Sequence, residues 1–128
     1  MALPALTLTY RCPAGAGVNA RRFVCLGNSD TEVRLATDAN TAIVGVSEQV
    51  PGVAGQLVDV IHSGVAMIEA GGPVARSSAL TSDGTGRAVV ANPATGVNAW
   101  VGAVALETAS AAGDFFRVLL TTHRMQGQ

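Results

Sequence analysis

Lysine is absent from this 128-residue sequence: its eight basic residues are all arginine and are set against nine acidic residues, for a net charge of -1. The glycine-rich stretch SDGTGR, residues 82–87, therefore lacks the lysine of a P-loop, and we interpret it as a hairpin turn. Nucleic-acid binding is disfavoured, because phosphates need clustered positive charge and the only basic pair is Arg21-Arg22. We interpret that pair as a solvated strand start.

Cysteines are also scarce: Cys12 and Cys25 are the only two, and they have no C-x-x-C spacing. Such a pair supports neither a zinc site nor a disulfide scaffold, so we expect reduced thiols in the core or at an interface. A disulfide between them is the alternative. No metal and no cofactor are expected.

Signals for export and for membrane insertion are missing as well. The first residues lack the charged and apolar regions of a signal peptide, and no apolar run reaches the roughly 18 residues that cross a bilayer. We therefore expect a soluble protein that is made in the cytoplasm.

Groups that could carry catalysis do not converge in the sequence. His62 ends a predicted strand, and no motif places a nucleophile beside it. Ser47, Asp59 and His62 are the residue types of a catalytic triad, but no G-x-S-x-G nucleophile elbow occurs, so we do not interpret them as one. Glu48 and Glu107 occupy matching places in two similar segments, which a repeat explains better than a catalytic carboxylate pair. We predict that the protein is not an enzyme.

Short runs of valine, isoleucine, leucine and alanine are abundant, and turn-forming residues separate them about every ten residues. No window keeps a helical period with caps at both ends, so any helix is a single turn, at residues 37–41 or 105–112. We predict an all-β chain that folds as a small β-barrel or sandwich. Strands are expected at residues 6–12, 22–26, 32–36, 42–47, 56–62, 65–70, 87–91, 99–106 and 115–121.

Two stretches of the sequence share one skeleton: VGVSEQVPGVAGQLVDVIHSG at residues 44–64 and VGAVALETASAAGDFFRVLL at residues 101–120. The comparison extends to two halves of about 55 residues, roughly 16–70 and 71–122, each with about four strands. We predict an internal pseudo-twofold repeat that closes one barrel and so removes exposed strand edges. Chance similarity among strands rich in glycine, valine and alanine is the alternative.

Four glycines are assigned structural roles in this prediction. Gly45 and Gly102 lie inside predicted strands, where glycine costs stability unless a bulge or a close backbone approach requires it. Gly55 and Gly113 precede the returning strands and suit turns with a positive φ.

The segment LTLTYRC, residues 6–12, alternates as a half-buried strand does. PAGAG, residues 13–17, follows as a flexible break, so we expect residues 1–15 to form an extended N-terminal arm with a hinge. A single β-barrel domain is expected over residues 16–122, and a C-terminal tail over residues 123–128. The apolar face of the arm consists of Leu6, Leu8, Tyr10 and Cys12.

The sequence resembles a family of small tailed-phage proteins that decorate or cement the capsid. The resemblance covers about residues 16–120, and its most telling parts are residues 58–72 and 111–120. The segments that carry it, in order, are ARRFVCL, AIVGVSEQ, AGQLVDVIHSGVAMIEAGGPVARSSALTSDGTGRAVVA and VGAVALETASAAGDFFRVLL.

This resemblance implies a structural protein on the outer surface of a phage head, assembled in the host cytoplasm. Such a protein bridges neighbouring major capsid protein subunits and stabilises the mature shell. The family is usually oligomeric, so a homotrimer is the first expectation and a homodimer the second. No nucleic-acid partner and no membrane partner are implied.

We hypothesise that the strand from Leu6 to Cys12 binds the capsid by strand addition. Its main chain would pair with an exposed capsid edge, while Leu6, Leu8 and Tyr10 fill alternate pockets. The alternative is that this strand completes its own barrel or that of a sister subunit.

A carbohydrate-binding or adhesive β-module displayed on a virion is the alternative function. Sugar sites rely on exposed aromatic rings for stacking, whereas the five aromatic residues here lie mostly in strand patterns typical of a core. A small enzyme or ligand carrier would need a pocket with converging polar groups. The aromatic residues are Tyr10, Phe23, Trp100, Phe115 and Phe116.

Overall fold

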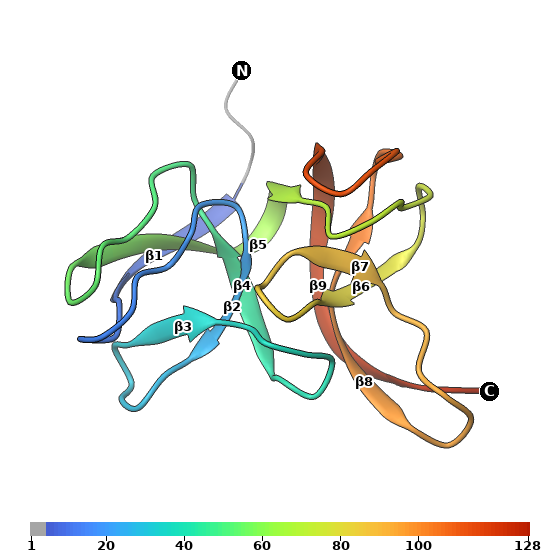
Figure 1. The fold of residues 1–128 in the computed structure, drawn as a ribbon, viewed down its shortest axis with the longest axis horizontal. Helices are drawn as coiled ribbons and strands as arrows, with labels where there is room; N and C mark the ends of the chain where they lie inside the picture. Colours follow the sequence, from blue (N-terminus) through green and yellow to red (C-terminus); the bar gives the residue numbers. More distant parts are fainter. Residues whose placement is uncertain (1–4) are drawn as a thin grey trace.

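A computed structural model describes residues 5–128, which form nine β-strands and no helix (Figure 1). The all-β prediction is therefore confirmed, and these residues contain no helix that could cross a membrane. The strands are β1 (Ala5–Arg11), β2 (Phe23–Leu26), β3 (Val33–Leu35), β4 (Ile43–Ser47), β5 (Leu57–Glu69), β6 (Ala79–Ser82), β7 (Ala88–Val90), β8 (Asn98–Ala105) and β9 (Phe115–Gln126).

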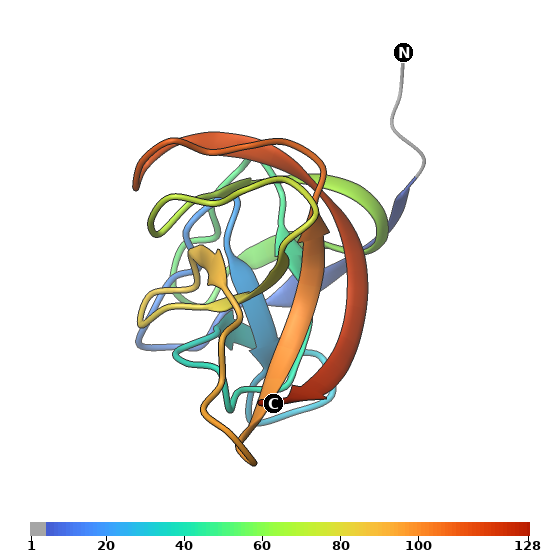
Figure 2. The same cartoon turned by 90° about the vertical axis from the view of Figure 1, so that its right-hand side faces the viewer.

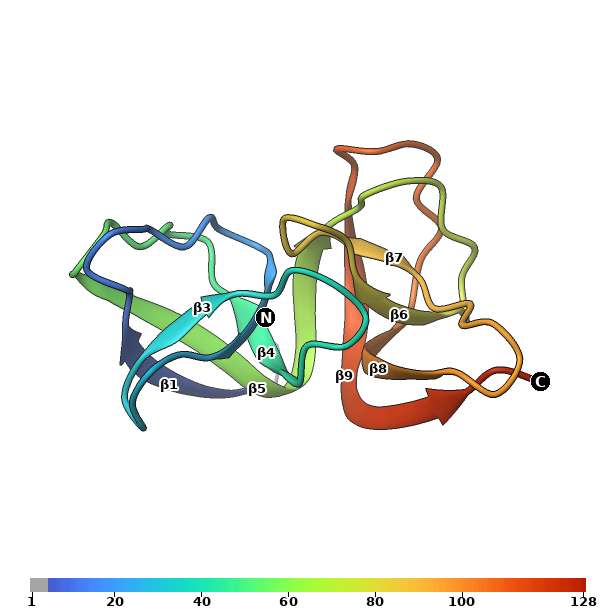
Figure 3. The same cartoon turned by 60° about the horizontal axis from the view of Figure 1, so that its bottom comes forward.

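All nine strands belong to one sheet with the order β3-β2-β4-β5-β9-β8-β6-β7, and β1 pairs with β5. The sheet curls into a half-barrel, and its long strands bend around the core (Figure 2). Two lobes lie side by side in Figures 1 and 3: β1–β4 with residues 57–64 of β5, and residues 65–69 of β5 with β6–β9. β2 pairs with β3 and β4, as β6 pairs with β7 and β8. The internal repeat itself stays a prediction.

β5 is a single strand of 13 residues, where the sequence indicated two strands separated by a turn at Ser63-Gly64. Gly64 does adopt a positive φ of 98°, but the ladder continues because β1 pairs with the residues before it and β9 with those after it. β5 has a β-bulge opposite β1. Leu6 pairs with Ser63 and Thr7 pairs with Ile61, which leaves His62 as the extra residue.

Two other strand features differ from the sequence prediction. β6 was not expected, because its buried residues include Thr81 and Ser82 and so hide the apolar alternation of a strand. β9 continues to Gln126, and residues 123–126 pair with residues 98–101 of β8. The segment expected as a C-terminal tail is therefore mostly strand.

The core consists of two clusters of buried side chains. The larger one spans both lobes, because Phe23 and Ile43 of the first lobe pack with Ile68 and Phe116 of the second. This shared packing joins the lobes into one body. The smaller cluster lies inside the first lobe and consists of Cys12, Val18, Val24, Val33, Val58 and Val60.

Both cysteines are free and buried, Cys12 in the smaller cluster and Cys25 on β2. Burial raises the pKa of both thiols above their ordinary value, because the charged thiolate is poorly solvated there. They are therefore inert packing residues of the first lobe.

Gly102 lies where the ladder between β8 and β9 is irregular, directly under an aromatic ring of the other lobe. A Cβ on Gly102 would lie 2.6 Å from Cε1 of Phe23 and 2.9 Å from Cγ2 of Ile43. Gly45 lies at a corresponding irregularity between β2 and β4, and a Cβ there would meet the main chain at Ile61. Both strand glycines therefore allow close approaches between packed segments.

Replacing Gly102 by alanine tests this packing. We expect Gly102→Ala to lower the free energy of unfolding by about 1–3 kcal/mol, because the added methyl group overpacks the contact with Phe23. Urea unfolding followed by circular dichroism measures the change. Gly72→Ala is the control, since a Cβ there would meet nothing within 4 Å. Equal stability of the two variants would contradict the close approach.

Candidate interaction surfaces

Ser47, Asp59 and His62, which were considered as a catalytic triad, have separate hydrogen-bond partners in the structure. The Ser47 hydroxyl donates to the Asn19 carbonyl at 2.6 Å, and the Asp59 carboxylate accepts from the Thr9 hydroxyl at 2.7 Å. Neither of these contacts involves His62. The three side chains therefore hold the first lobe together in different places.

His62 links β1, β4 and β5 through its two ring nitrogens. Nδ1 lies 2.8 Å from the Val44 carbonyl oxygen, which can only accept, so Nδ1 carries the proton. Nε2 then accepts from the Tyr10 hydroxyl at 2.6 Å. Tyr10 is thereby turned toward the core, and Cys12 is fully buried beside it. Two of the four residues expected to touch the capsid thus belong to the protein's own interior.

β1 is antiparallel to β5 over its whole length, from Ala5 to Arg11, so it completes its own sheet, as the alternative interpretation had it. Residues 1–4 of the expected arm lie outside the described residues. Leu6 and Leu8 remain 54% and 48% exposed. Within residues 5–128, the edge of β1 away from β5 has main-chain bonds only at its end, where the Arg11 N–H donates to the Thr31 carbonyl at 2.8 Å.

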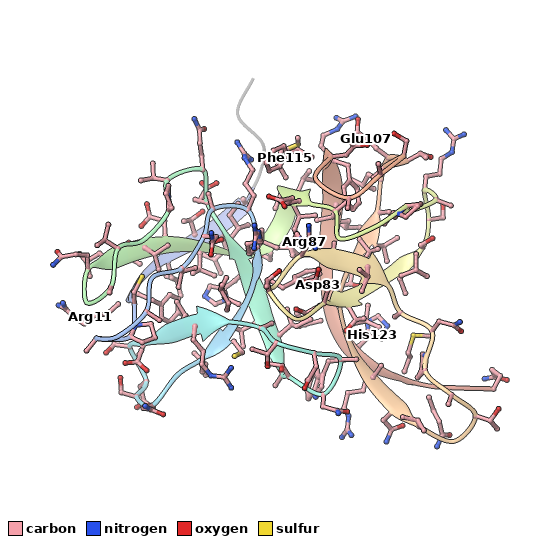
Figure 4. The ribbon with its side chains drawn as sticks, viewed as in Figure 1. Arg11, Asp83, Arg87, Glu107, Phe115 and His123 are labelled. Atoms are coloured by element: carbon pink, nitrogen blue, oxygen red, sulfur yellow. The ribbon has the colours of Figure 1, made fainter. Side chains whose placement is uncertain are left out.

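The basic pair Arg21-Arg22 is divided between two environments, and its interpretation as solvated was wrong for Arg22. The Arg22 guanidinium is 14% exposed and lies 3.3 Å from the Glu69 carboxylate. Glu69 also lies 3.8 Å from Arg87, whose Nε donates to Asp83 at 3.0 Å. This chain of charges joins the start of β2, the end of β5 and the loop of residues 83–87. Figure 4 shows Asp83 and Arg87 of that loop between the lobes.

Asp83 organises that loop. Burial of its carboxylate opposes ionisation, but N–H groups of Thr85 and Arg87 and the Arg87 guanidinium donate to it. The hydrogen bonds and the positive charge outweigh the burial and lower the pKa of Asp83 below its ordinary value. The glycine-rich stretch is thus a hydrogen-bonded turn.

The lowered pKa of Asp83 gives stability a pH dependence. The contribution is complete above the unfolded pKa of about 4 and is lost as the pH falls through the lower folded pKa. We expect Asp83→Asn to cost about 1–2 kcal/mol at pH 7 and progressively less below pH 4, measured by urea unfolding. Asp30→Asn, in an exposed loop, serves as the control. A cost that stayed constant with pH would contradict an ionic role.

Outward-facing residues of β5 and β9 form an exposed apolar surface beside Arg21. Phe116, Val118 and Leu120 point inward, so the residues between them point outward. Cross-strand pairing places Val65 beside Leu119 and Met67 beside Arg117. We define the Phe115 patch as Arg21, Val65, Met67, Phe115 and Leu119.

Arg21 is held in an unusual conformation at the rim of this patch. Its φ of +58° is rare for a residue other than glycine. Its N–H donates to the Ser47 carbonyl at 3.0 Å, and its own carbonyl accepts from the Glu69 N–H at 3.0 Å. The guanidinium carbon lies 5.9 Å from the centre of the Phe115 ring, within reach of a cation–π contact.

Two adjoining grooves run from the Phe115 patch along β5. One of about 290 Å³ includes Arg21, Val65 and Met67, and the other, of about 530 Å³, includes Leu57 and Asp59. Both grooves are bordered by Glu48 and Gln49. The partner of Glu107 is Arg117 and not Glu48: its carboxylate accepts from the Arg117 N–H at 2.7 Å and from the Arg117 guanidinium. These bonds lower the pKa of Glu107 below its ordinary value.

Phe115 is the one aromatic side chain that is mostly exposed in the part of the chain that the structure describes, at 53%. Figure 4 shows it at the same end of the molecule as Glu107, away from Arg11 and His123. The aromatic residues were interpreted mostly as core residues, yet the period-two alternation through Phe116, Val118 and Leu120 indicates that Phe115 points outward.

The comparison with protein families decides the class of the chain. A family model described as phage cement protein matches residues 3–120. The chain belongs to this family. The resemblance seen in the sequence is thereby confirmed, and a structural role at the phage capsid follows from membership.

One solved structure has the same fold as this cement protein over most of both chains. It is the N base of the head fiber gp8.5 of bacteriophage phi29, with a TM-score of 0.69 and 23% sequence identity. The match covers 92% of this chain and 95% of that chain. No curated protein matches the sequence.

Within residues 5–128, no group of three His, Cys, Asp or Glu residues could hold a metal ion. Trp100 is half-buried and has the Arg124 guanidinium carbon 5.5 Å from its ring centre, so its face is covered. A row of exposed aromatic rings for sugar stacking is thus missing from the described residues, and the carbohydrate-binding alternative gains no support.

Proposed function

We propose that this cement protein binds the outer surface of a phage head, bridges neighbouring major capsid protein subunits and stabilises the mature shell. The observation that carries the proposal is the family match over residues 3–120, together with the exposed aromatic ring of Phe115 on the Phe115 patch. The protein then acts by contact alone, on the virion surface.

We assign the capsid contact to the Phe115 patch. Aromatic and arginine side chains dominate the binding energy of protein interfaces, and this patch offers Phe115 with Arg21 beside it. The conformation of Arg21 costs on the order of 1–3 kcal/mol, which the surrounding main-chain bonds sustain. Strained residues of this kind cluster at functional sites.

The stabilising effect follows from linkage. A protein that binds the mature shell and not the immature or disrupted shell stabilises it by the binding free energy of each occupied site. A shell offers many equivalent sites, so a modest contact at each one is sufficient. The shared core and the charged chain between the lobes keep the patch in a fixed shape during binding.

Truncation of Phe115 tests the contact. We expect Phe115→Ala to weaken binding to undecorated expanded capsids about 30-fold, because the loss of an aromatic anchor costs about 2 kcal/mol or more. Co-sedimentation over a concentration series measures the affinity. Val97→Ala removes a comparably exposed apolar side chain elsewhere and should bind as the unmodified protein does. Unchanged binding of Phe115→Ala would refute the assignment of the patch, and failure of the unmodified protein to bind would refute the function.

Shell stability provides a second test. We expect expanded shells to melt at a higher temperature after addition of the protein, with an increase that grows with its free concentration. Differential scanning calorimetry of shells with and without the protein measures this increase. Unexpanded shells are the control and should melt unchanged. Equal melting of decorated and undecorated expanded shells would contradict a cementing role.

A further inference from the structure

The two adjoining grooves beside β5 form one continuous depression, which we call the β5 groove. Glu48 and Gln49 border both parts, while Leu57 lines the larger part and Met67 the smaller one. Met67 follows Leu57 by ten positions in β5, which is about 30 Å along a strand at roughly 3.3 Å per residue. A depression of this length fits an extended chain segment of about ten residues.

Carboxylates set the charge of the larger part of the β5 groove. Its lining includes Glu48 and Asp59 and no basic side chain. In the described part of the chain neither carboxylate forms an ion pair, and the carboxylate of Asp59 accepts from the Thr9 hydroxyl at 2.7 Å. Arg11, at the end of β1, instead donates to the Gly55 carbonyl at 2.8 Å. The groove therefore presents negative charge that the chain itself does not neutralise.

Aliphatic side chains line the β5 groove along its length. Val50 and Leu57 are exposed in the larger part, and Val65 and Met67 are half-buried in the smaller part. Burying such side chains against a partner is favourable, because apolar surface is removed from water. A groove that combines aliphatic side chains with carboxylates is complementary to a segment that combines aliphatic and basic side chains.

We propose that the β5 groove binds an extended segment of the major capsid protein that contains aliphatic residues and one lysine or arginine. The basic side chain lies beside Glu48 and Asp59, and the aliphatic side chains cover Leu57 and Met67. The groove is continuous with the Phe115 patch, because Val65 and Met67 belong to both, so one partner covers both surfaces. This inference rests on the proposed function, since it names the part of the capsid protein that is bound.

Arg21 gives the β5 groove a direction. It lines only the smaller part, beside Phe115, whereas Asp59 lines only the larger part. The two ends of the groove therefore carry opposite charges. A segment bound in reverse would place its basic residue beside Arg21, where like charges repel each other. The charge distribution thus selects one direction of the bound segment.

Charge reversal at Glu48 tests the electrostatic part of this proposal with undecorated expanded capsids. We expect Glu48→Lys to weaken binding at least about 10-fold in co-sedimentation, because like charges then meet in the groove. Glu48→Gln only removes the charge and should weaken binding about 3-fold. Added salt should weaken binding of the unmodified protein more steeply than that of Glu48→Gln, because salt screens the charge pair.

Asp30→Lys is the matched control, since it makes the same change in net charge at an exposed residue outside the groove. This variant should bind as the unmodified protein does. Thermal melting by circular dichroism should show that the Glu48 variants fold, because Glu48 bonds to Asp59 through its main-chain N–H, which both substitutions retain. Equal binding of Glu48→Lys and Asp30→Lys would overturn the charge complementarity.

Overlapping synthetic peptides that cover the major capsid protein test whether the bound segment is extended. We expect a peptide with aliphatic residues and a lysine or arginine to compete with expanded capsids for the unmodified protein. The same peptide should bind Glu48→Lys at least about 10-fold more weakly. The absence of any competing peptide would overturn the extended segment.

Failure of this inference is distinguishable from failure of the proposed function. If Phe115→Ala loses binding to capsids while Glu48→Lys retains it, the function stands and the β5 groove is not the site of the segment. If the unmodified protein does not bind expanded capsids, the proposed function itself is refuted.

Discussion

The ladder between residues 65–69 of β5 and residues 115–119 of β9 is the contact on which the rest of the molecule depends. Because β5 runs from the first lobe directly into this ladder, the two lobes form one sheet, and the inward pairs of the ladder, Ala66 with Val118 and Ile68 with Phe116, belong to the shared core. Strand alternation turns the next residues outward, so the same ladder presents Phe115 to solvent. The same pairing of β5 with β9 therefore contributes both to the shared core and to the interaction surface.

Contacts around this ladder make the surface rigid. The N–H of Glu69 bonds to the carbonyl of Arg21, and the carboxylate of Glu69 lies between Arg22 and Arg87. One residue at the end of β5 thus fixes the backbone that positions the arginine of the patch and links that backbone to the loop from the other lobe. A binding surface that is ordered before contact loses less conformational entropy on binding, which suits a protein that acts by contact alone.

Strand positions were predictable from the sequence because β-branched and leucine-rich runs alternate with turns, and the family was recognisable from the order of its segments. The continuity of β5 was not, because a Ser63-Gly64 pair is typical of a turn and only the neighbouring strands show that the ladder continues through it. The ion pair that partly buries Arg22 was also unpredictable, since its partner Glu69 is 47 residues away along the chain. Phe115 could have been found by strict alternation alone.

The seven-residue edge of β1 has a physical logic within this fold. Its inner edge is occupied by β5, and Tyr10 and Cys12 anchor its end in the first lobe, so the strand is fixed to its own lobe while its other edge stays open within residues 5–128. The Phe115 patch lies on the other half of β5, where residues 65–69 pair with β9. The open edge of β1 and the patch therefore occupy different parts of one sheet.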